Sequence, residues 1–453
     1  MTLQAIVVCP VVLLLALLLA RRGLDLREQR MVGLGYLFHI VGSVAIVLYH
    51  SVYDGDMNMY AMLGKQIAYV ISVDPVRWGG ETLKLALQLD NDLPVEVLLP
   101  GTSTGSMSAF TGLVMSAVGD SMYATAFVFS TFAFMGLVGF YRASRSFLAA
   151  SERIPALIGL LFVPSVVFWT GGMVKEAVVV GFAGMMCEAL HRVFSRRQPL
   201  AIIPLVVGIE GTLITKPYVL LSLVVAFGAW FYATNNARLG WPGRIFAALA
   251  VAVGIAFVTH RYPELSPENI TESFSKAQRN YGLIASGGGG SEITVGEDDG
   301  APPTVLGHLK WAPLGLTNSL ARPFLFEVHN VNMAVAALEM TAIIFTFGVL
   351  LRRHGVRRLL AEVRTHPPLL FAVTLVLLLG ASVGLATRNL GTLSRYRVPM
   401  MPMYVAGLLV LRARFAALGR RIPMRLKRGT STALGRARAR SQRTPESRSI
   451  ATK

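Results

Sequence analysis

Long runs of apolar residues, separated by shorter polar stretches, occupy most of this 453-residue chain. Several of the runs approach the roughly 20 residues that a helix needs to cross a bilayer. Lipid offers the backbone no hydrogen-bond partners, so an unbroken apolar run predicts a helix, whereas the strands of a membrane barrel would alternate apolar and polar side chains. We therefore predict an all-α, polytopic membrane protein with about 11 transmembrane helices. The predicted spans are 3–20, 32–52, 121–141, 154–171, 177–190, 200–215, 218–234, 245–260, 332–351, 368–386 and 398–412.

The polar stretches divide the chain into two parts. Residues 1–412 are predicted as a polytopic membrane domain, and residues 413–453 as a basic, disordered tail. Two long polar stretches in the membrane domain, at about 53–120 and 261–331, are predicted as loops on one side of the membrane. Apolar residues at helical spacing over 59–71 predict one short amphipathic helix at the interface. The fifth and sixth spans are short, which leaves a shallow pair or a re-entrant hairpin as an alternative there.

The distribution of charge predicts the orientation. The chain is 53% apolar and only 15% charged, yet its net charge is +18. If the N-terminus lies outside, the cytoplasmic connections and the tail together hold 30 of the 43 Lys and Arg residues, as the positive-inside rule requires. The predicted protein is therefore a multi-pass protein of the inner (cytoplasmic) membrane, with its N-terminus outside and its C-terminus in the cytoplasm.

The tail is a candidate for binding an anionic surface. From Arg412 onward it has 13 Lys and Arg residues against one Glu. Nucleic acid is disfavoured as its partner, because no aromatic residue follows Phe415 to stack on bases and the tail directly follows a predicted span. Anionic lipid headgroups, which attract each nearby basic residue by ~1 kcal/mol, are the expected partner.

Charged residues on the predicted outer side are the candidate functional groups. Cations there run against the positive-inside trend, and six of them lie next to helix ends: Lys175, Lys216, Arg322, Arg388, Arg395 and Arg397. We expect these six to form a basic pocket for phosphate or pyrophosphate, which Arg can contact through two hydrogen bonds. The alternative is a set of interfacial anchors that pair with acids such as Glu176 or Glu327. In the first outer loop, Asp54 and Asp56 are candidates either for acid–base chemistry or for helix N-terminal caps.

Three short motifs give the chain a resemblance to a known group of enzymes. They are Tyr53-Asp54-Gly55-Asp56 with Tyr60, Pro164-Ser165 through Phe168-Trp169 to Lys175-Glu176, and Arg395-Tyr396-Arg397-Val398-Pro399. In their order the parts resemble bacterial polysaccharide-assembly enzymes of the C-type glycosyltransferase (GT-C) superfamily and Wzy-type or EpsG-like polymerases. The first motif has Asp-Gly-Asp where better-defined members carry Asp-Glu or Glu-x-Asp.

The resemblance implies a membrane glycosyltransferase or polysaccharide polymerase that takes a polyprenyl-phosphate- or polyprenyl-pyrophosphate-linked sugar on the external face. It implies Asp54 or Asp56 as general base, and as substrate-binding residues Lys175, Glu176, Lys216, Arg322, Arg388, Arg395, Tyr396 and Arg397. Other polysaccharide-assembly proteins of the envelope are expected partners. No ligand set with metal-binding spacing is visible, although the acidic first loop leaves a divalent cation as an alternative. Two other functions stay open: a flippase or exporter of lipid-linked glycans, and a non-catalytic scaffold of an envelope complex.

Overall fold

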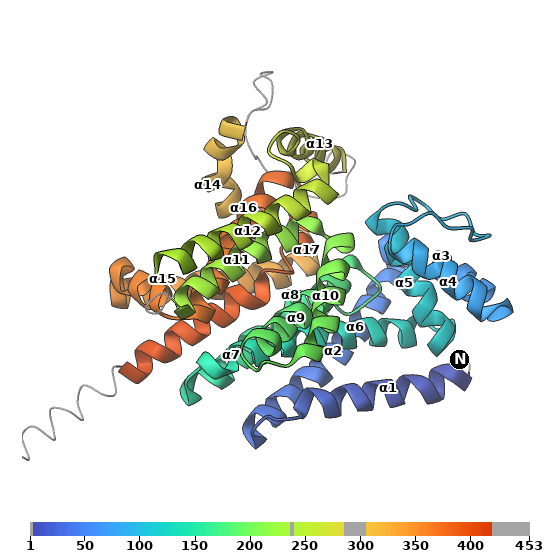
Figure 1. Cartoon of the computed structure of the whole chain (residues 1–453), viewed down its shortest axis with the longest axis horizontal. Coiled ribbons are helices and arrows are strands. Elements are labelled where there is room, and N and C mark those ends of the chain that lie inside the picture. Colours follow the sequence, from blue (N-terminus) through green and yellow to red (C-terminus); the bar gives the residue numbers. More distant parts are fainter. Residues whose placement is uncertain (1–2, 236–239, 285–304, 419–453) are drawn as a thin grey trace, which may run out of the picture.

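The computed structural model describes residues 3–235, 240–284 and 305–418, and within them every regular element is a helix (Figure 1). In this part of the chain, eight helices are long and apolar enough to cross a membrane, and two shorter apolar helices accompany them. The long ones are α2 (Leu26–Val52), α6 (Met122–Ser144), α9 (Lys175–Phe194), α11 (Pro217–Asn235), α12 (Trp241–Arg261), α15 (Val331–Thr365), α16 (Pro367–Ala386) and the C-terminal helix (Met401–Leu418). The shorter ones are α1 (Leu3–Arg21) and α10 (Ile202–Thr215). The chain is therefore a polytopic helical membrane protein.

One predicted span is interrupted. Residues 154–171 form two short helices, α7 (Ala150–Leu161) and α8 (Pro164–Trp169), with a break at Phe162 and Val163. Pro164 accounts for the break, because a proline disfavours helical geometry in the residue before it and is well placed in the first turn of a new helix. Of the two short predicted spans, 177–190 lies within the 20-residue helix α9, and 200–215 forms the shorter α10.

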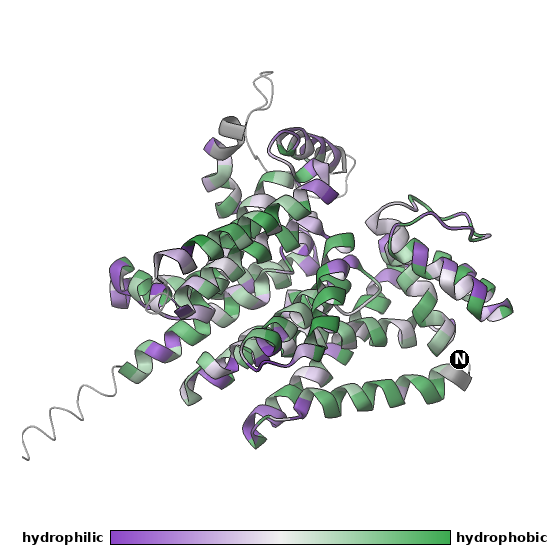
Figure 2. Cartoon of the chain, viewed as in Figure 1, coloured by the Kyte–Doolittle hydropathy of each residue, from purple (hydrophilic) through white to green (hydrophobic). Residues whose placement is uncertain are grey.

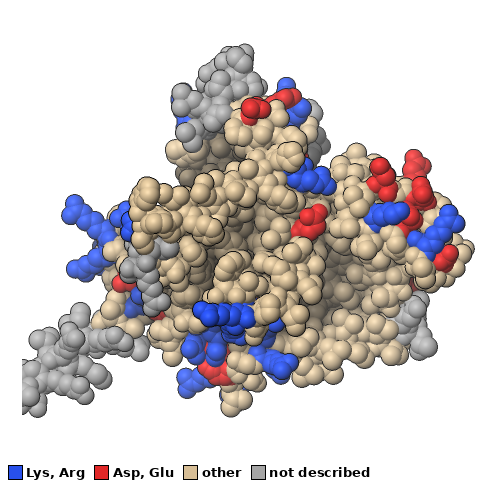
Figure 3. All heavy atoms as spheres, in the orientation of Figure 1, with Lys and Arg blue, Asp and Glu red and all other residues tan. Residues whose placement is uncertain are grey.

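The bundle has two chemically different ends. At one end, here called the site end, α2, α10 and α16 finish and α9 and α11 begin. At the opposite end, the basic end, α1 finishes at Arg21 and α2 begins after Asp25. Figure 3 shows Lys and Arg gathered along the lower and left edges of the molecule, and Asp and Glu gathered over α3 and α4 at the upper right. In Figure 2 the hydrophobic residues fill the helices of the bundle, and hydrophilic residues collect at its ends.

The two long polar stretches carry more helix than the sequence predicts. The first contains three helices rather than one: α3 (Asp56–Val73), α4 (Pro75–Ala86) and α5 (Ser103–Val118). The second contains α13 (Ile270–Ile284) and α14 (Val305–Ala321), while its centre, 285–304, lies outside the described residues. α3 packs closely on α5, since a Cβ added at Gly112 would collide with the side chain of Ile67. Figure 1 shows α3, α4 and α5 together at the right of the molecule, with α5 beside α6.

The C-terminal helix extends past residue 413, where the predicted tail begins. It continues to Leu418, and Arg414 within it donates hydrogen bonds to Glu152 and Glu362. Residues 419–453, which carry most of the basic charge of the predicted tail, lie outside the described residues.

Small residues let α6 and α9 pack in close contact. A Cβ added at Gly184 would collide with the backbone oxygen of Gly136, and a Cβ at Gly139 would meet the oxygen of Gly184 at 2.6 Å. Lipid gives helices no hydrophobic reason to associate, so close backbone approach through small residues is a common basis of packing in membranes. This contact fixes the position of α9, whose first two residues belong to the candidate site.

Candidate functional site

Five charged side chains meet at the site end: Asp56, Lys175, Glu176, Lys216 and Arg395. They are called the ionic cluster below. Asp56 is the first residue of α3, Lys175 and Glu176 begin α9, Lys216 lies between α10 and α11, and Arg395 lies in the last turn of α17 (Leu390–Tyr396). Three cations and two carboxylates give the cluster a net charge of +1.

Local sequence positions these side chains. Lys216 has extended backbone geometry (φ −148°, ψ 84°), as expected of a residue that precedes a proline, here Pro217. Asn389 caps the start of α17: its side-chain oxygen accepts hydrogen bonds from the backbone N–H groups of Gly391 (2.8 Å) and Thr392 (3.3 Å). This cap fixes where the short helix starts, and Arg395 in its last turn contacts Glu176 of α9.

Glu176 is the centre of the cluster. Its side chain is fully buried and accepts from Lys216 Nζ at 2.7 Å and from Arg395 Nε at 3.0 Å. Arg395 also donates through Nη1 to Asp56 Oδ2 at 2.9 Å, so one guanidinium joins a buried carboxylate to an exposed one. Burial acts to lower the pKa of Arg395, but the charges of Glu176 and Asp56 outweigh it and raise that pKa. Arg395 is therefore a permanent cation with one face toward solvent.

Lys175 contacts the start of α5. Its Nζ donates to the hydroxyl groups of Ser103 (2.9 Å) and Thr104 (3.1 Å). A helix N-terminus carries partial positive charge, so a lysine beside it is in an electrostatically unfavourable place unless an anion is also present. Lys175 and the α5 N-terminus thus add to the positive potential of the cluster.

Aromatic rings border the cluster. The guanidinium of Arg395 lies 5.7 Å from the ring centroid of Trp169, and Lys216 Nζ lies 4.5 Å from that of Tyr396 and 6.0 Å from that of Tyr218. These distances are within cation–π range. Tyr60 lies on the α3 side, where burial and then the charge of Asp56 raise the pKa of its hydroxyl, so it is a neutral group at physiological pH.

The two candidate carboxylates of the first motif have different roles. Asp54 is exposed and accepts hydrogen bonds from Gly55 N (2.9 Å) and Asn58 Nδ2 (3.1 Å), and these bonds, that of Asn58 foremost, lower its pKa. This is the behaviour of a residue that stabilises the turn into α3. Asp56, in contrast, reaches across to Arg395. Of the two carboxylates, the structure brings Asp56 to the ionic cluster.

Three of the six predicted pocket cations are not part of the cluster. Arg322 pairs with Glu327, five residues further along the chain. Arg397 is completely buried, donates to the backbone oxygen of Arg322, and leaves Nε and Nη2 without a partner among the described residues. Arg388 is partly buried and makes no ion pair within the described part of the chain. Of the six outer cations that the sequence predicts to lie together, the structure brings three into the ionic cluster.

Sequence reasoning missed several groups at this site. Ser103 and Thr104 carry no signal beyond a Ser/Thr-rich segment, and only the structure brings them to Lys175. Glu339 on α15 lies within an apolar run, and it accepts hydrogen bonds from both the backbone N–H (2.9 Å) and the hydroxyl (2.7 Å) of Ser165 at the start of α8. Glu339 thus satisfies two hydrogen-bond donors in the first turn of α8, the helix that ends at Trp169.

Within the described residues, no group of three or more His, Cys, Asp and Glu side chains could hold a metal ion.

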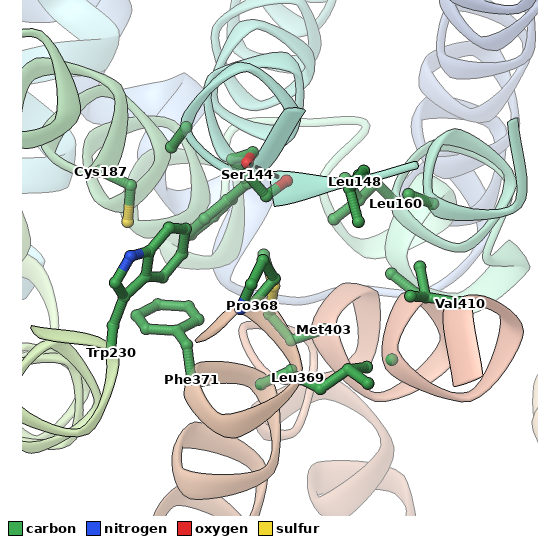
Figure 4. Close-up of a pocket in the computed structure, with 16 residues that line it drawn as sticks. Ser144, Leu148, Leu160, Cys187, Trp230, Pro368, Leu369, Phe371, Met403 and Val410 are labelled. Carbon is green, nitrogen blue, oxygen red and sulfur yellow. Dashed lines mark hydrogen bonds between the residues drawn. The ribbon is translucent and has the colours of Figure 1, made fainter. Parts of the chain in front are cut away.

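A separate, apolar cavity lies inside the bundle (Figure 4). In Figure 4 the rings of Trp230 and Phe371 lie together, with Cys187, Met403 and Leu369 around the same space. No residue of the ionic cluster lines it. None of its lining residues is charged, and the Ser144 hydroxyl already donates to the backbone, so the ionic cluster is the stronger candidate site.

Comparisons with known proteins give no match: no family model matches the chain, and no similar curated protein or solved structure is found.

Proposed function

We propose that the chain is a membrane glycosyltransferase or polysaccharide polymerase that uses a polyprenyl-phosphate- or polyprenyl-pyrophosphate-linked sugar at the ionic cluster. The observation that carries the proposal is the cluster itself. Segments far apart in the sequence contribute three cations and an exposed carboxylate to one place at the end of a helix bundle. Such a site suits a membrane-bound substrate that combines a phosphate with a group to be deprotonated.

The proposed topology places this site outside the cell. It has eleven crossings, the N-terminus outside and the C-terminus in the cytoplasm of a cell with an inner (cytoplasmic) membrane. The charge distribution supports it, because the connections at the basic end are rich in Arg and those at the site end are not. A lipid-linked sugar in the outer leaflet would then have its phosphate at the depth of the ionic cluster.

The cluster can bind an anion more readily than its ion pairs suggest. Its net charge is +1, and Lys175 has only hydroxyl groups as hydrogen-bond partners among the described residues. A phosphate that binds Lys175 and Arg395 would compete with the exposed Asp56 for the same guanidinium. Arg395 would keep its bond to the buried Glu176, which holds the side chain in place. Binding of the donor would thus release Asp56 without dismantling the cluster.

Asp56 would then act as general base. It would accept the proton of the acceptor hydroxyl as that oxygen forms a bond to the anomeric carbon and the phosphate leaves with the bonding electrons. Lys175, Lys216 and Arg395 would stabilise the negative charge that develops on the leaving phosphate. Trp169, Tyr218 and Tyr396 would offer flat apolar faces to sugar rings. Envelope polysaccharide-assembly proteins are the proposed protein partners, and anionic lipid the partner of the basic tail.

The decisive experiment is the lipid-linked glycan profile of cells that carry Arg395→Ala, compared with wild-type and deletion strains. Accumulation of a lipid-linked repeat unit on the outer leaflet, with loss of polymer, is the expected result for Arg395→Ala and for the deletion. Arg77→Ala is the matched control, because Arg77 is an exposed arginine on α4 whose guanidinium lies over the ring of the neighbouring Trp78, away from the ionic cluster.

The alternatives give different profiles. A flippase or exporter would leave the lipid-linked unit on the cytoplasmic leaflet when it is deleted. A scaffold would tolerate Arg395→Ala while the deletion strain loses polymer. A normal polymer in both the Arg395→Ala and the deletion strains would contradict the proposed function.

A further inference from the structure

The long helix α15 bends sharply at the basic end. Gly355 interrupts it with φ +72° and ψ 156°, a conformation that glycine adopts without strain. The straight part before Gly355 rises about 36 Å at about 1.5 Å per residue, which is enough to cross a hydrocarbon core of about 30 Å. The segment after Gly355 therefore begins where the lipid headgroups of the basic end must lie. Residues 352–366, which include this bend, are here called the arginine elbow.

The inner face of the elbow is fixed to the bundle. Leu359 and Val363, four residues apart, are buried against it. Glu362 on the same side accepts two hydrogen bonds from Arg414 of the C-terminal helix, at 2.9 and 3.0 Å. Arg414 is shared with Glu152 of α7 at 3.0 Å. The elbow is thus a docked element with a defined outer face.

The outer face is strongly basic. Five exposed arginines lie along it and none forms an ion pair with a carboxylate in the described part of the chain: Arg352, Arg353, Arg357, Arg358 and Arg364. Two apolar side chains lie among them on one flank, Val356 at 56% and Leu360 at 47% exposed. Figure 3 shows Lys and Arg atoms at the left edge of the molecule, where one end of α15 lies in Figure 1.

We propose that the arginine elbow is a docking surface for the headgroups of anionic phospholipids. Its five exposed cations match the negative charge of such headgroups, and arginine can contact a phosphate through two hydrogen bonds. Its depth is set by the length of the straight part of α15, and the flank with Val356 and Leu360 can enter the upper acyl region, as in other interfacial amphipathic helices. The proposal concerns a surface remote from the ionic cluster and does not depend on the proposed function.

A fluorescent reporter on the elbow can measure which lipid lies there. Val356→Cys introduces an exposed thiol, while the two natural cysteines are 3% exposed. The full-length protein, labelled at this position, is reconstituted in mixed phosphatidylcholine and phosphatidylglycerol bilayers in which one lipid or the other carries a bromine quencher. The ratio of the two quenching efficiencies gives the preference for phosphatidylglycerol at the elbow.

The elbow variant is R357Q/R358Q/R364Q, which keeps Leu359, Glu362 and Val363. An arginine near an anionic surface contributes about a fivefold preference, so the triple change should lower the phosphatidylglycerol preference by about tenfold or more. The matched control, R27Q/R30Q/R196Q, removes the same charge from other exposed positions of the basic end and should change it by less than about twofold. High salt should weaken the preference of the unmodified elbow, because it shortens the range of surface electrostatics.

Two results would overturn the proposal. One is the absence of a phosphatidylglycerol preference in the protein with an intact elbow, which would leave a soluble acidic partner as the occupant. The other is an equal loss in the elbow variant and the control, which would show a general effect of surface charge. Because the elbow variant keeps all the contacts that dock the segment, its apparent unfolding temperature should match that of the control, and this measurement confirms that a loss of preference is not a loss of fold.

Discussion

At the scale of single residues, the buried carboxylate of Glu176 is what holds the ionic cluster together. It faces Lys216 and Arg395, and among the described residues neither cation has another buried carboxylate as close. Removing one member of a buried ion pair leaves the other charges uncompensated, which costs far more than the pair itself contributes. The cluster should therefore respond very differently to changes at its buried and exposed carboxylates.

Glu176→Gln should lower the free energy of unfolding by about 3 kcal/mol, because two cations would then face each other without a carboxylate between them. Unfolding of the purified protein in detergent measures this change. Glu272→Gln is the control: it removes a carboxylate from an exposed pair with Lys276 on α13, where solvent screens the interaction, and should have little effect. Equal stability of the two variants would contradict the central role of Glu176.

Asp56 and Asp54 should differ in their effect on activity. Loss of a general base lowers a rate by about 100-fold or more, so Asp56→Asn should reduce polymer formation at least that much. Asp54→Asn should reduce it by less than about tenfold, since Asp54 only stabilises the turn into α3. The rate of polymer formation in membranes that contain the lipid-linked donor measures both. A larger loss for Asp54→Asn would assign the catalytic role to the other carboxylate.

Single residues were only partly predictable from sequence. Arg395, Lys216 and Lys175 stand out because cations on the outer side are rare. The sequence gives no means to separate them from Arg397, which follows Arg395 by two residues yet is fully buried, whereas Arg395 keeps contact with solvent. A turn of backbone after Tyr396 sends the two side chains to different environments, and that turn depends on tertiary packing.

At the scale of helices, the apolar runs predict most of the bundle because lipid leaves the backbone few alternatives. α5 was missed because its sequence is rich in Ser, Thr and Gly, a composition typical of loops. In the structure these small residues are needed: a Cβ at Gly112 would collide with Ile67 of α3, and one at Gly64 would meet Thr111. The same error occurred at 352–366, the predicted connection between two spans, where helix α15 resumes after Gly355. In both cases, packing against a neighbouring helix outweighs local composition.

The close contact of α6 and α9 gives a prediction at this scale. Gly184→Leu should destabilise the bundle and reduce activity, because its side chain would collide with the backbone of Gly136 and shift the start of α9. Gly348→Leu is the matched control: a Cβ at Gly348 on α15 meets nothing within 4 Å. Thermal unfolding and polymer formation should both fall for the first variant and stay close to wild type for the second. Unchanged stability of Gly184→Leu would show that the two helices can separate without cost.

At the scale of the whole molecule, two arginines of the C-terminal region form ion pairs that link helices at both ends of the bundle. Arg395 joins α17 to α3 and α9 at the site end, and Arg414 joins the C-terminal helix to α7 and α15 at the basic end. The first predicted outer loop and the last helices are thus in direct contact, although Asp56 and Arg395 are 339 residues apart in the chain. The sequence predicts that both lie on one side of the membrane. It cannot predict their contact, because nothing in an isolated sequence pairs a distant acid with a particular base.

The orientation of the whole molecule can be tested with two single cysteines. Val76→Cys on α4 is 89% exposed at the site end, and Val356→Cys is exposed at the basic end. The proposed topology requires that a membrane-impermeant thiol reagent label position 76 in intact cells and label position 356 only after the membrane is opened. This follows from the excess of arginine at the basic end, which favours retention in the cytoplasm. The reverse pattern would place the ionic cluster in the cytoplasm, where a donor held in the outer leaflet could not reach it, and the proposed external reaction would have to be abandoned.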